Sequence, residues 1–243
     1  MESIYTQNFQ ISGNHVDCFG RLKLSTLLYF AQEAAGNHFD CIAMTYDQLA
    51  EKGMFWAIIR QRVRITRLPR IGENIRIETW PMPNTRVAFP RCVVAYDESG
   101  SELFQVLSLW VLMDLESRAM ILPGKSGIDL PTTLRGFELP APGSLPAKQL
   151  LNHRSRTVCF TDLDRNGHMN NTKYLDWIAD LLPSGFHEQH CPTEFTVCYL
   201  SEAREGQELT LSWEFDEEGI LNLDAHRAKG EKSERIFSAK LCF

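Results

Sequence analysis

The sequence predicts an α+β fold made of two copies of one unit, each a long buried helix wrapped by a curved antiparallel β-sheet. Two observations favour this fold. A short acidic turn that leads into an apolar helical pattern occurs twice, and β-rich segments follow each occurrence. The copies are 147 positions apart, since Asp17 and Gly20 recur as Asp164 and Gly167.

Each predicted helix is marked by apolar residues at helical spacing after its turn. In the first copy, the turn Asp17-Cys-Phe-Gly-Arg21 precedes Leu24, Leu27, Leu28, Ala31, Ala34 and Ala35. In the second copy, Asp164-Arg-Asn-Gly-His168 precedes Tyr174, Leu175, Ile178, Leu181 and Leu182. The expected N-caps are Ser25 and either Asn170 or Asn171, because their side chains can accept from free amides of the first turn. The high apolar content predicts helices that are buried on most sides.

The β-rich segments form a meander in each copy. The predicted strands are 55–66, 70–80, 87–96 and 103–113 in the first copy, and 194–200, 204–213, 220–227 and 235–243 in the second. Turns are expected at 97–100 and 229–231. A helix wrapped by such a sheet is the hotdog fold, so the sequence predicts two hotdogs in tandem.

A proline- and glycine-rich segment separates the two copies. It holds five of the eleven prolines, at positions 123, 131, 140, 142 and 146, and the glycines 124, 127, 136 and 143. Such a composition is typical of an interdomain connector. The predicted domains are therefore an N-terminal hotdog over 1–125, a connector over 126–148 and a C-terminal hotdog over 149–243.

The composition is that of an ordinary globular protein, with 44% apolar and 23% charged residues. We expect a cytoplasmic protein, because the N-terminus lacks a signal sequence and no segment has the ~20 apolar residues that span a membrane. Seven cysteines without CxxC spacing indicate reduced thiols. A formal charge of −6 disfavours general nucleic-acid binding, which needs a basic face.

The second turn carries an acid, an amide and an imidazole at alternate positions: Asp164, Asn166 and His168. Residues two apart in an extended segment point to the same side, so these groups are expected to converge as a reaction centre. A capping role could explain Asp164 alone. The first copy keeps the acid but has Phe19 and Arg21 at the other two positions. This difference indicates that one half does chemistry while the other holds substrate.

The chain resembles the acyl-acyl-carrier-protein (acyl-ACP) thioesterases of plants and bacteria. The resemblance is carried by the run Asp162-Leu-Asp-Arg-Asn-Gly-His-Met-Asn-Asn-Thr-Lys-Tyr-Leu-Asp-Trp177, and more weakly by 56–63, 69–73 and 109–114. It implies catalytic roles for Asp164, Asn166 and His168, and, by matching Tyr199, for Glu202. From the residues alone, Glu202 could equally be a solvated surface acid. Plant members carry a cysteine where this chain has Ala203, which argues against a thiol mechanism.

Thioester hydrolysis needs a nucleophile, a route for its proton and stabilisation of an oxyanion. Backbone N–H groups from Gly167 to Asn171 and the positive end of the second helix are expected to stabilise the oxyanion. Asp164 or Glu202 could deprotonate a water or attack directly, and both routes stay open. The expected reaction uses no metal and no cofactor.

Two further groups of residues are expected to bind the substrate. The resemblance implies an acyl cavity in the first hotdog, with Leu27, Ala31, Ala34, Phe55 and Trp56 as candidates, although such residues can equally be plain core. Arg60, Arg62 and Arg64 alternate on one strand face, opposite Gln61, Val63 and Ile65. This face could dock acidic acyl carrier protein or simply be solvated.

The pair His187 and His190 has a spacing of three, where the zinc-protease helix motif needs four, so a loop between Pro183 and Pro192 is expected there. The overall prediction is an acyl-ACP thioesterase without a membrane span, either a monomer or a homodimer. The alternatives are a hotdog thioesterase acting on acyl-CoA and an acyl-binding module without turnover.

Overall fold

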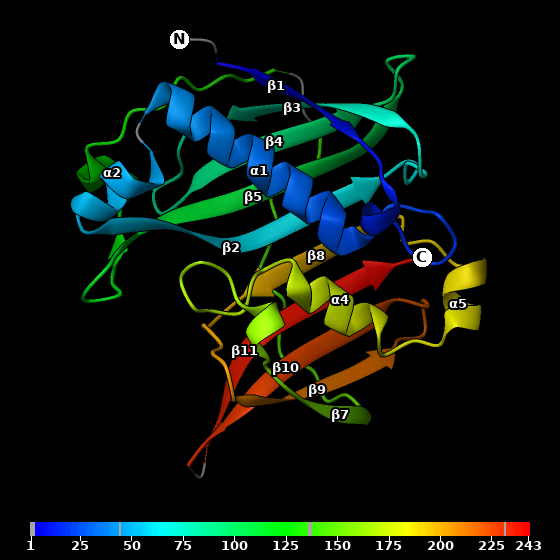
Figure 1. Ribbon diagram of the computed structural model, residues 1–243. Coiled ribbons are helices and arrows are strands. Elements are labelled where there is room, and N and C mark those ends of the chain that lie inside the picture. Colours follow the sequence, from blue (N-terminus) through cyan, green and yellow to red (C-terminus); the bar gives the residue numbers. More distant parts are fainter. Residues whose placement is uncertain (1–2, 44, 136–137, 231) are drawn as a thin grey trace. The chain divides into compact units, whose positions relative to one another are not determined.

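The computed structural model describes residues 3–43, 45–135, 138–230 and 232–243. It divides into Met1–Pro142 and Gly143–Phe243, called unit 1 and unit 2 below (Figure 1). Gly136 of the predicted connector and Glu231 of the predicted turn lie outside the described residues. No helix in the described ranges is long and apolar enough to cross a membrane.

Unit 1 is an antiparallel sheet with one long helix on its inner face. The strand order is β1 (Tyr5–Gln10), β3 (Asn74–Pro81), β4 (Phe89–Tyr96), β5 (Glu102–Asp114) and β2 (Met54–Ile65), and the short β6 (Met120–Ile121) pairs with β5. Helix α1 (Leu24–Ile42) lies across this sheet (Figure 1). It buries ten residues, which confirms a long buried helix in the first copy.

The two ends of α1 show how its sequence sets local structure. Lys23 is the N-cap and Ser25 is buried inside the first turn, so the prediction of Ser25 as N-cap is wrong. After α1, Thr45 begins the short helix α2 (Tyr46–Glu51) with a capping box, in which its hydroxyl accepts from the Gln48 amide.

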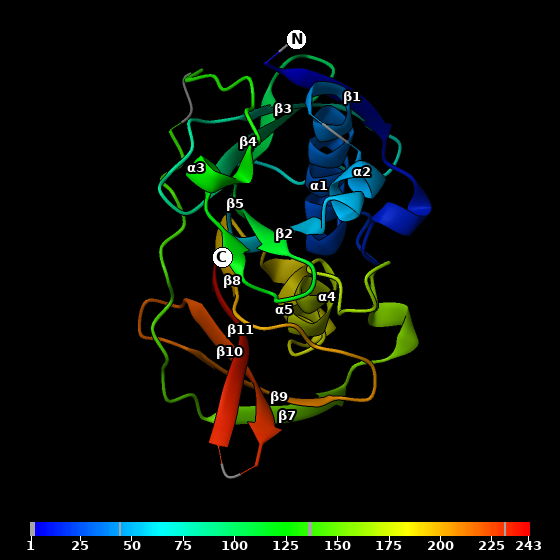
Figure 2. The same ribbon diagram turned by 90° about the vertical axis from the view of Figure 1, so that its left-hand side faces the viewer.

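The outer face of the unit 1 sheet is covered by the segment that follows β6. This segment begins with α3 (Pro123–Ser126), which lies on the side of the sheet opposite α1 (Figure 2). Further along, Leu139 packs on Trp80, Cys92, Val94 and Leu107. Ile128 and Leu130, in contrast, belong to the cluster that contains Phe39 of α1, on the helix side of the sheet. The first part of the proline-rich segment thus belongs to the core of unit 1.

Unit 2 repeats the strand order of unit 1. Its sheet runs β7 (Asn152–Thr157), β9 (Glu208–Phe215), β10 (Leu221–Lys229), β11 (Lys232–Cys242) and β8 (Glu194–Tyr199). The helix on it, α4 (Lys173–Ala179), has only seven residues, so the expectation of a long helix is wrong for this copy. Thr172 is its N-cap instead of Asn170 or Asn171, but the Asn170 side chain accepts from the Thr172 amide at 2.9 Å.

All eight predicted strands overlap observed strands, which confirms the meander in both copies. The first strand of each unit, β1 or β7, was not predicted, and β7 (Asn-His-Arg-Ser-Arg-Thr) has no apolar residue that could have shown it. The predicted loop around His187 is wrong, because α5 (Ser184–Gln189) occupies it and begins directly after Pro183.

Candidate active site

The acidic run of unit 2 is a tight turn closed by Asp164. The carboxylate Oδ1 of Asp164 accepts from the backbone N–H of Asn166 at 2.8 Å and of His168 at 3.2 Å. The Gly167 N–H donates to the Asp164 carbonyl at 3.0 Å, with φ of +73° at Gly167, a conformation that favours glycine. The expectation of an extended segment is therefore wrong: Asn166 is exposed whereas His168 is buried.

Unit 1 contains the same turn. Oδ1 of Asp17 accepts from the amides of Phe19 at 2.9 Å and Arg21 at 3.0 Å, and Gly20 has φ of +73°. Because the two turns share this geometry, the aspartate shapes the turn in both units. Whatever chemistry Asp164 contributes comes in addition to this structural role.

The residue that ends each turn distinguishes the two copies. Arg21 folds back onto its own turn, with Nε 3.1 Å from Oδ2 of Asp17. His168 instead places Nε2 3.1 Å from Oε2 of Glu202, and the two side chains are 11% and 42% exposed. Unit 2 therefore holds an imidazole and a carboxylate in contact, with the carboxylate open to solvent.

Glu202 reaches His168 because its loop pairs with the turn. The Met169 N–H donates to the Ala203 carbonyl at 2.8 Å, just as the Leu22 N–H donates to Pro69 in unit 1 at 2.9 Å. Ala203 and Pro69 are thus equivalent in the two units, and the residues directly before them, Glu202 and Leu68, correspond as well. The structure thus brings Glu202 to His168 through backbone contacts that both units share.

Charged side chains on β10 and β11 hold the Glu202 loop. Arg227 donates from Nη1 to the Glu202 carbonyl at 3.1 Å and from Nη2 to Oε2 of Glu234 at 2.6 Å. The Ser201 hydroxyl donates to Oε1 of Glu234 at 2.7 Å. The Arg227 and Ser201 hydrogen bonds lower the pKa of Glu234 to about 2. Sequence patterns missed Arg227 and Glu234, because their partners lie far from them in the chain.

The expected oxyanion donors are mostly occupied. The amides of Gly167 and His168 already donate to Asp164, to its carbonyl and to Oδ1 respectively. The amide of Met169 donates to the Ala203 carbonyl and that of Asn170 to the Asp162 carbonyl. The expectation that these four amides stabilise an oxyanion is therefore wrong. In the part of the chain that the structure describes, the Asn171 amide makes no hydrogen bond. The Tyr199 hydroxyl donates to the Asn171 carbonyl at 3.2 Å, and burial raises the pKa of Tyr199, which keeps it a donor. Asn171 is therefore the backbone donor that remains for a ligand.

Ala203, which follows Glu202 in its loop, is buried. The exposed cysteine nearest to Ala203 in the sequence is Cys159. The Cys159 amide donates to Oδ2 of the buried Asp162 at 3.0 Å.

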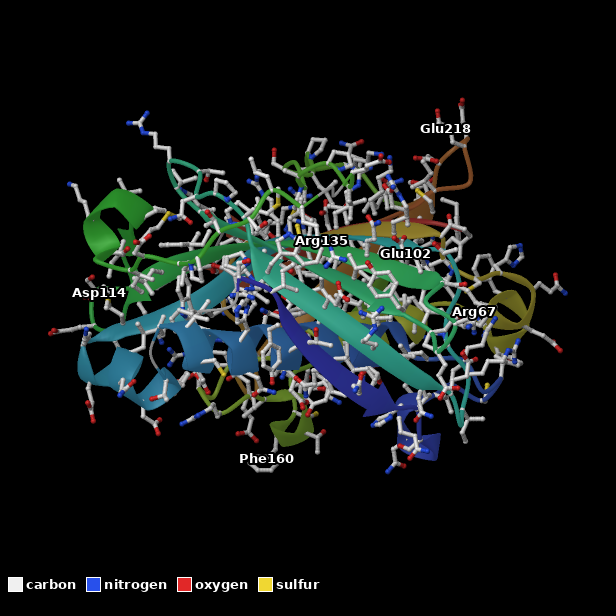
Figure 3. The ribbon with its side chains drawn as sticks, turned by 90° about the horizontal axis from the view of Figure 1, so that it is seen from above. Arg67, Glu102, Asp114, Arg135, Phe160 and Glu218 are labelled. Carbon is white, nitrogen blue, oxygen red and sulfur yellow. The ribbon has the colours of Figure 1, made fainter. Side chains whose placement is uncertain are left out.

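Phe160, between Cys159 and Asp162 in the sequence, is 76% exposed and points outward (Figure 3). The corresponding residue of unit 1, 147 positions earlier, is Gly13. The aromatic ring is thus a feature of unit 2 only.

Unit 1 contains a cavity of about 170 Å³ beneath the second half of α1. Of the five predicted acyl-cavity residues, Trp56 lines it, together with Phe39, Phe89, Trp110 and Arg91. Leu27, Ala31 and Ala34 lie in the core at 0–2% exposure, and Phe55 packs under Arg118 with the guanidinium 4.9 Å from the ring centre.

The predicted arginine face is present on β2. Arg60, Arg62 and Arg64 are half-buried and alternate with the buried residues Gln61, Val63 and Ile65, although a bulge interrupts the register between Ile58 and Arg60. The three side chains therefore share a face of the strand, as the alternation predicted.

The histidines in α5 and directly after it contact separate backbone carbonyls. His187 Nε2 lies 2.9 Å from Ala179 O, and His190 Nδ1 lies 3.0 Å from Phe186 O. Within the described ranges, no group of three or more His, Cys, Asp or Glu side chains is arranged to hold a metal ion.

Two hotdog units, one with a carboxylate and an imidazole in contact at its turn, make this a tandem hotdog protein. The chain belongs to the acyl-ACP thioesterase family, a family of thioester hydrolases. The model of the family's N-terminal domain matches residues 2–122, and that of its C-terminal domain matches residues 147–240.

Several curated relatives are plant enzymes. The chain is 26% identical over 214 residues to a chloroplastic palmitoyl-acyl carrier protein thioesterase of Gossypium hirsutum, covering 82% of this chain and 52% of that protein. It is 24% identical over 221 residues to a chloroplastic dodecanoyl-[acyl-carrier-protein] hydrolase of Cinnamomum camphora, covering 82% and 56%. The chain thus spans about half the length of the curated relatives it matches.

Solved structures of similar proteins confirm the fold over the whole chain. An acyl-ACP thioesterase from Bacteroides thetaiotaomicron superposes with a TM-score of 0.87 at 24% identity, covering 99% of this chain and 98% of that one. The 12:0-ACP thioesterase from Umbellularia californica gives a TM-score of 0.81 at 20% identity, covering 99% and 97%. The tandem hotdog prediction is therefore confirmed.

Proposed function

We propose that the protein hydrolyses fatty acyl thioesters of acyl carrier protein, giving a free fatty acid and the carrier thiol, at the turn of unit 2. The observation that carries this proposal is the contact between His168 and Glu202. Unit 1 has Arg21 and Leu68 at the corresponding positions, so the pair is not a by-product of the fold.

In the proposed reaction Glu202 removes a proton from a water, and His168 donates from Nε2 to orient the carboxylate. The water oxygen bonds to the thioester carbon, whose carbonyl electrons move to its oxygen. The Asn171 amide, with the exposed side chain of Asn166, donates to this oxyanion. When the carbonyl re-forms, the carbon–sulfur bond breaks and Glu202 returns its proton to the departing thiolate.

Direct attack by Asp164 or Glu202 is the competing route, and it would form an acyl anhydride before water releases the acid. Turnover in ¹⁸O-water reveals the anhydride route when water attacks the carboxyl carbon of the enzyme side chain, because ¹⁸O then remains in the enzyme. The proposed water route predicts that peptides containing Asp164 and Glu202 keep their mass.

The proposed substrate contacts lie on unit 1. Its cavity would take the acyl chain, and Arg60, Arg62 and Arg64 would dock the acidic carrier protein and its pantetheine phosphate. The proposed division of labour is thus the one expected from the sequence, with substrate held by 1–125, a connector over 126–148 and catalysis in 149–243. The free thiols of all seven cysteines fit the expected cytoplasmic location.

The testing experiment is hydrolysis of a series of acyl-ACP thioesters by the wild type, Asp164→Ala and His168→Ala, in parallel with acyl-CoA substrates of matched chain length. The proposal expects turnover of acyl-ACP by the wild type and a strong loss in both variants. A strong preference for CoA esters would favour the acyl-CoA alternative. Tight binding of acyl-ACP without turnover would indicate an acyl-binding module.

A further inference from the structure

A buried arginine lies between the helix and the sheet of unit 1. Arg91 is on the inner face of β4 next to Phe89, and it is only 6% exposed. Its Nη1 lies 3.0 Å from Nδ1 of His38 on α1 and 3.3 Å from Oγ1 of Thr79 on β3. His38 is itself 2% exposed and stacks on Tyr5 with ring centres 5.6 Å apart. The guanidinium is therefore held firmly at a defined position in the core.

Within the described residues, the contacts of Arg91 include no counter-charge. Its Nη1 donates to Nδ1 of His38 and to the hydroxyl oxygen of Thr79, and neither acceptor is a carboxylate. Among the described residues no acceptor bonds Nε or Nη2, and no carboxylate pairs with Arg91. On β3, Glu78 points to the opposite face of the sheet from Thr79 and pairs there with Arg76 and Arg135. Burial lowers the pKa of Arg91 to about 10, which still leaves it charged at neutral pH.

The cavity of unit 1 is lined by Arg91 among mostly apolar side chains. Its walls include Phe39 and Phe89, and also Trp56 and Trp110, whose indole nitrogens are themselves buried. The acid on its lining, Asp40, is exposed to solvent and does not pair with Arg91. An apolar pocket with a charged hydrogen-bond donor on its lining is complementary to an apolar ligand that ends in an acceptor.

We propose that this cavity binds the far end of an acyl chain that carries an oxygen acceptor, a carboxylate or a hydroxyl, and that the Nε and Nη2 edge of Arg91 donates to it. The inference rests on the proposed function, because it takes the ligand to be the acyl part of the substrate. A methyl-ended chain would fill the same space but leave the guanidinium unpaired. A carboxylate matches the two parallel N–H groups of that edge, and a hydroxyl matches one of them.

The test measures binding of non-hydrolysable pantetheine analogues, in which a methylene replaces the thioester sulfur. The chains end in methyl, hydroxyl or carboxylate at a series of matched lengths. Dissociation constants are measured for the wild type, for Arg91→Met, and for Arg67→Met, a control that removes an exposed arginine of the same unit. Circular dichroism reports whether each variant is folded.

At the best length, the wild type is expected to bind an oxygen-ended chain about tenfold or more tightly than the methyl-ended one. Arg67→Met is expected to keep this preference and Arg91→Met to lose it. Equal or tighter binding of the methyl-ended chain by the wild type at every length would overturn the inference, and this comparison needs no variant. A preference for oxygen-ended chains without hydrolysis of any thioester would support the inference while the proposed function failed.

Discussion

Asp17 and Asp164 perform the same structural task in the two units, since Oδ1 of each accepts two backbone amides across a turn closed by a glycine with φ of +73°. The duplication therefore supplies an internal control. A property that both aspartates share belongs to the fold, whereas a property of Asp164 alone belongs to the site.

The first prediction compares the two aspartates. Asp164→Ala removes two hydrogen bonds and Asp17→Ala removes three, so each should lower the free energy of unfolding by about 1–3 kcal/mol. Only Asp164→Ala should also reduce hydrolysis of acyl-ACP, by about 100-fold or more, because its turn positions His168. Urea unfolding and steady-state kinetics on both variants check this. Equal losses of activity in the two variants would contradict the placement of catalysis at the turn of unit 2.

The second prediction concerns Glu202 as the base. Glu202→Gln keeps a hydrogen-bonding group beside His168 but cannot take a proton, so kcat should fall by roughly 10²–10⁴-fold. Stability should change little, because the side chain is 42% exposed. Glu205→Gln, an exposed acid in the same loop, is the matched control and should retain its activity. A Glu202→Gln enzyme with normal kcat would exclude this residue as the base.

The third prediction follows from the lowered pKa of Glu234, which drops from an ordinary 4.5 to about 2. A folded-state pKa below the unfolded value stabilises the fold above pH 4.5, and this contribution disappears as the pH falls towards 2. Glu234→Gln should therefore be less stable than the wild type at pH 7, with the difference shrinking in acid. Denaturant unfolding across this range measures it, and a difference that does not change with pH would contradict the prediction.

The fourth prediction tests docking of the carrier protein. Reversing the charge at Arg62 and Arg64 to glutamate should raise KM for acyl-ACP several-fold while leaving hydrolysis of a small acyl-pantetheine thioester unchanged. The effect should weaken at high salt. Arg154→Glu, an exposed arginine of β7, serves as control. An unchanged KM for acyl-ACP would leave the arginine face as ordinary solvated surface.

Strand positions were accessible to sequence reasoning because the alternation of apolar residues is local. Arg60, Arg62 and Arg64 alternate with buried residues as predicted. The polar strand β7 has no such alternation, since what makes it a strand is its pairing with β9. The length of α4 was overestimated because Leu181 and Leu182 continue the helical spacing beyond Ala179, where the helix ends.

The site was only partly accessible for a related reason. The sequence singles out Asp164 and His168, but the hydrogen bonds of Asp164 bend the segment and so place Asn166 and His168 in different environments. The partners of Glu202, His168 and Arg227, are distant in the chain, and no spacing rule links them. Arg91 did leave a sequence signal, a lone charge inside an apolar strand.

The His168–Glu202 contact is most directly tested by kcat/KM for an acyl-ACP thioester with His168→Ala, alongside Arg21→Ala at the corresponding position of unit 1. If unit 2 is the catalytic half, His168→Ala loses about 10²–10⁴-fold in kcat/KM while it remains folded, and Arg21→Ala stays within about threefold of the wild type. A folded His168→Ala enzyme that also stays within about threefold would contradict the assignment of catalysis to this pair.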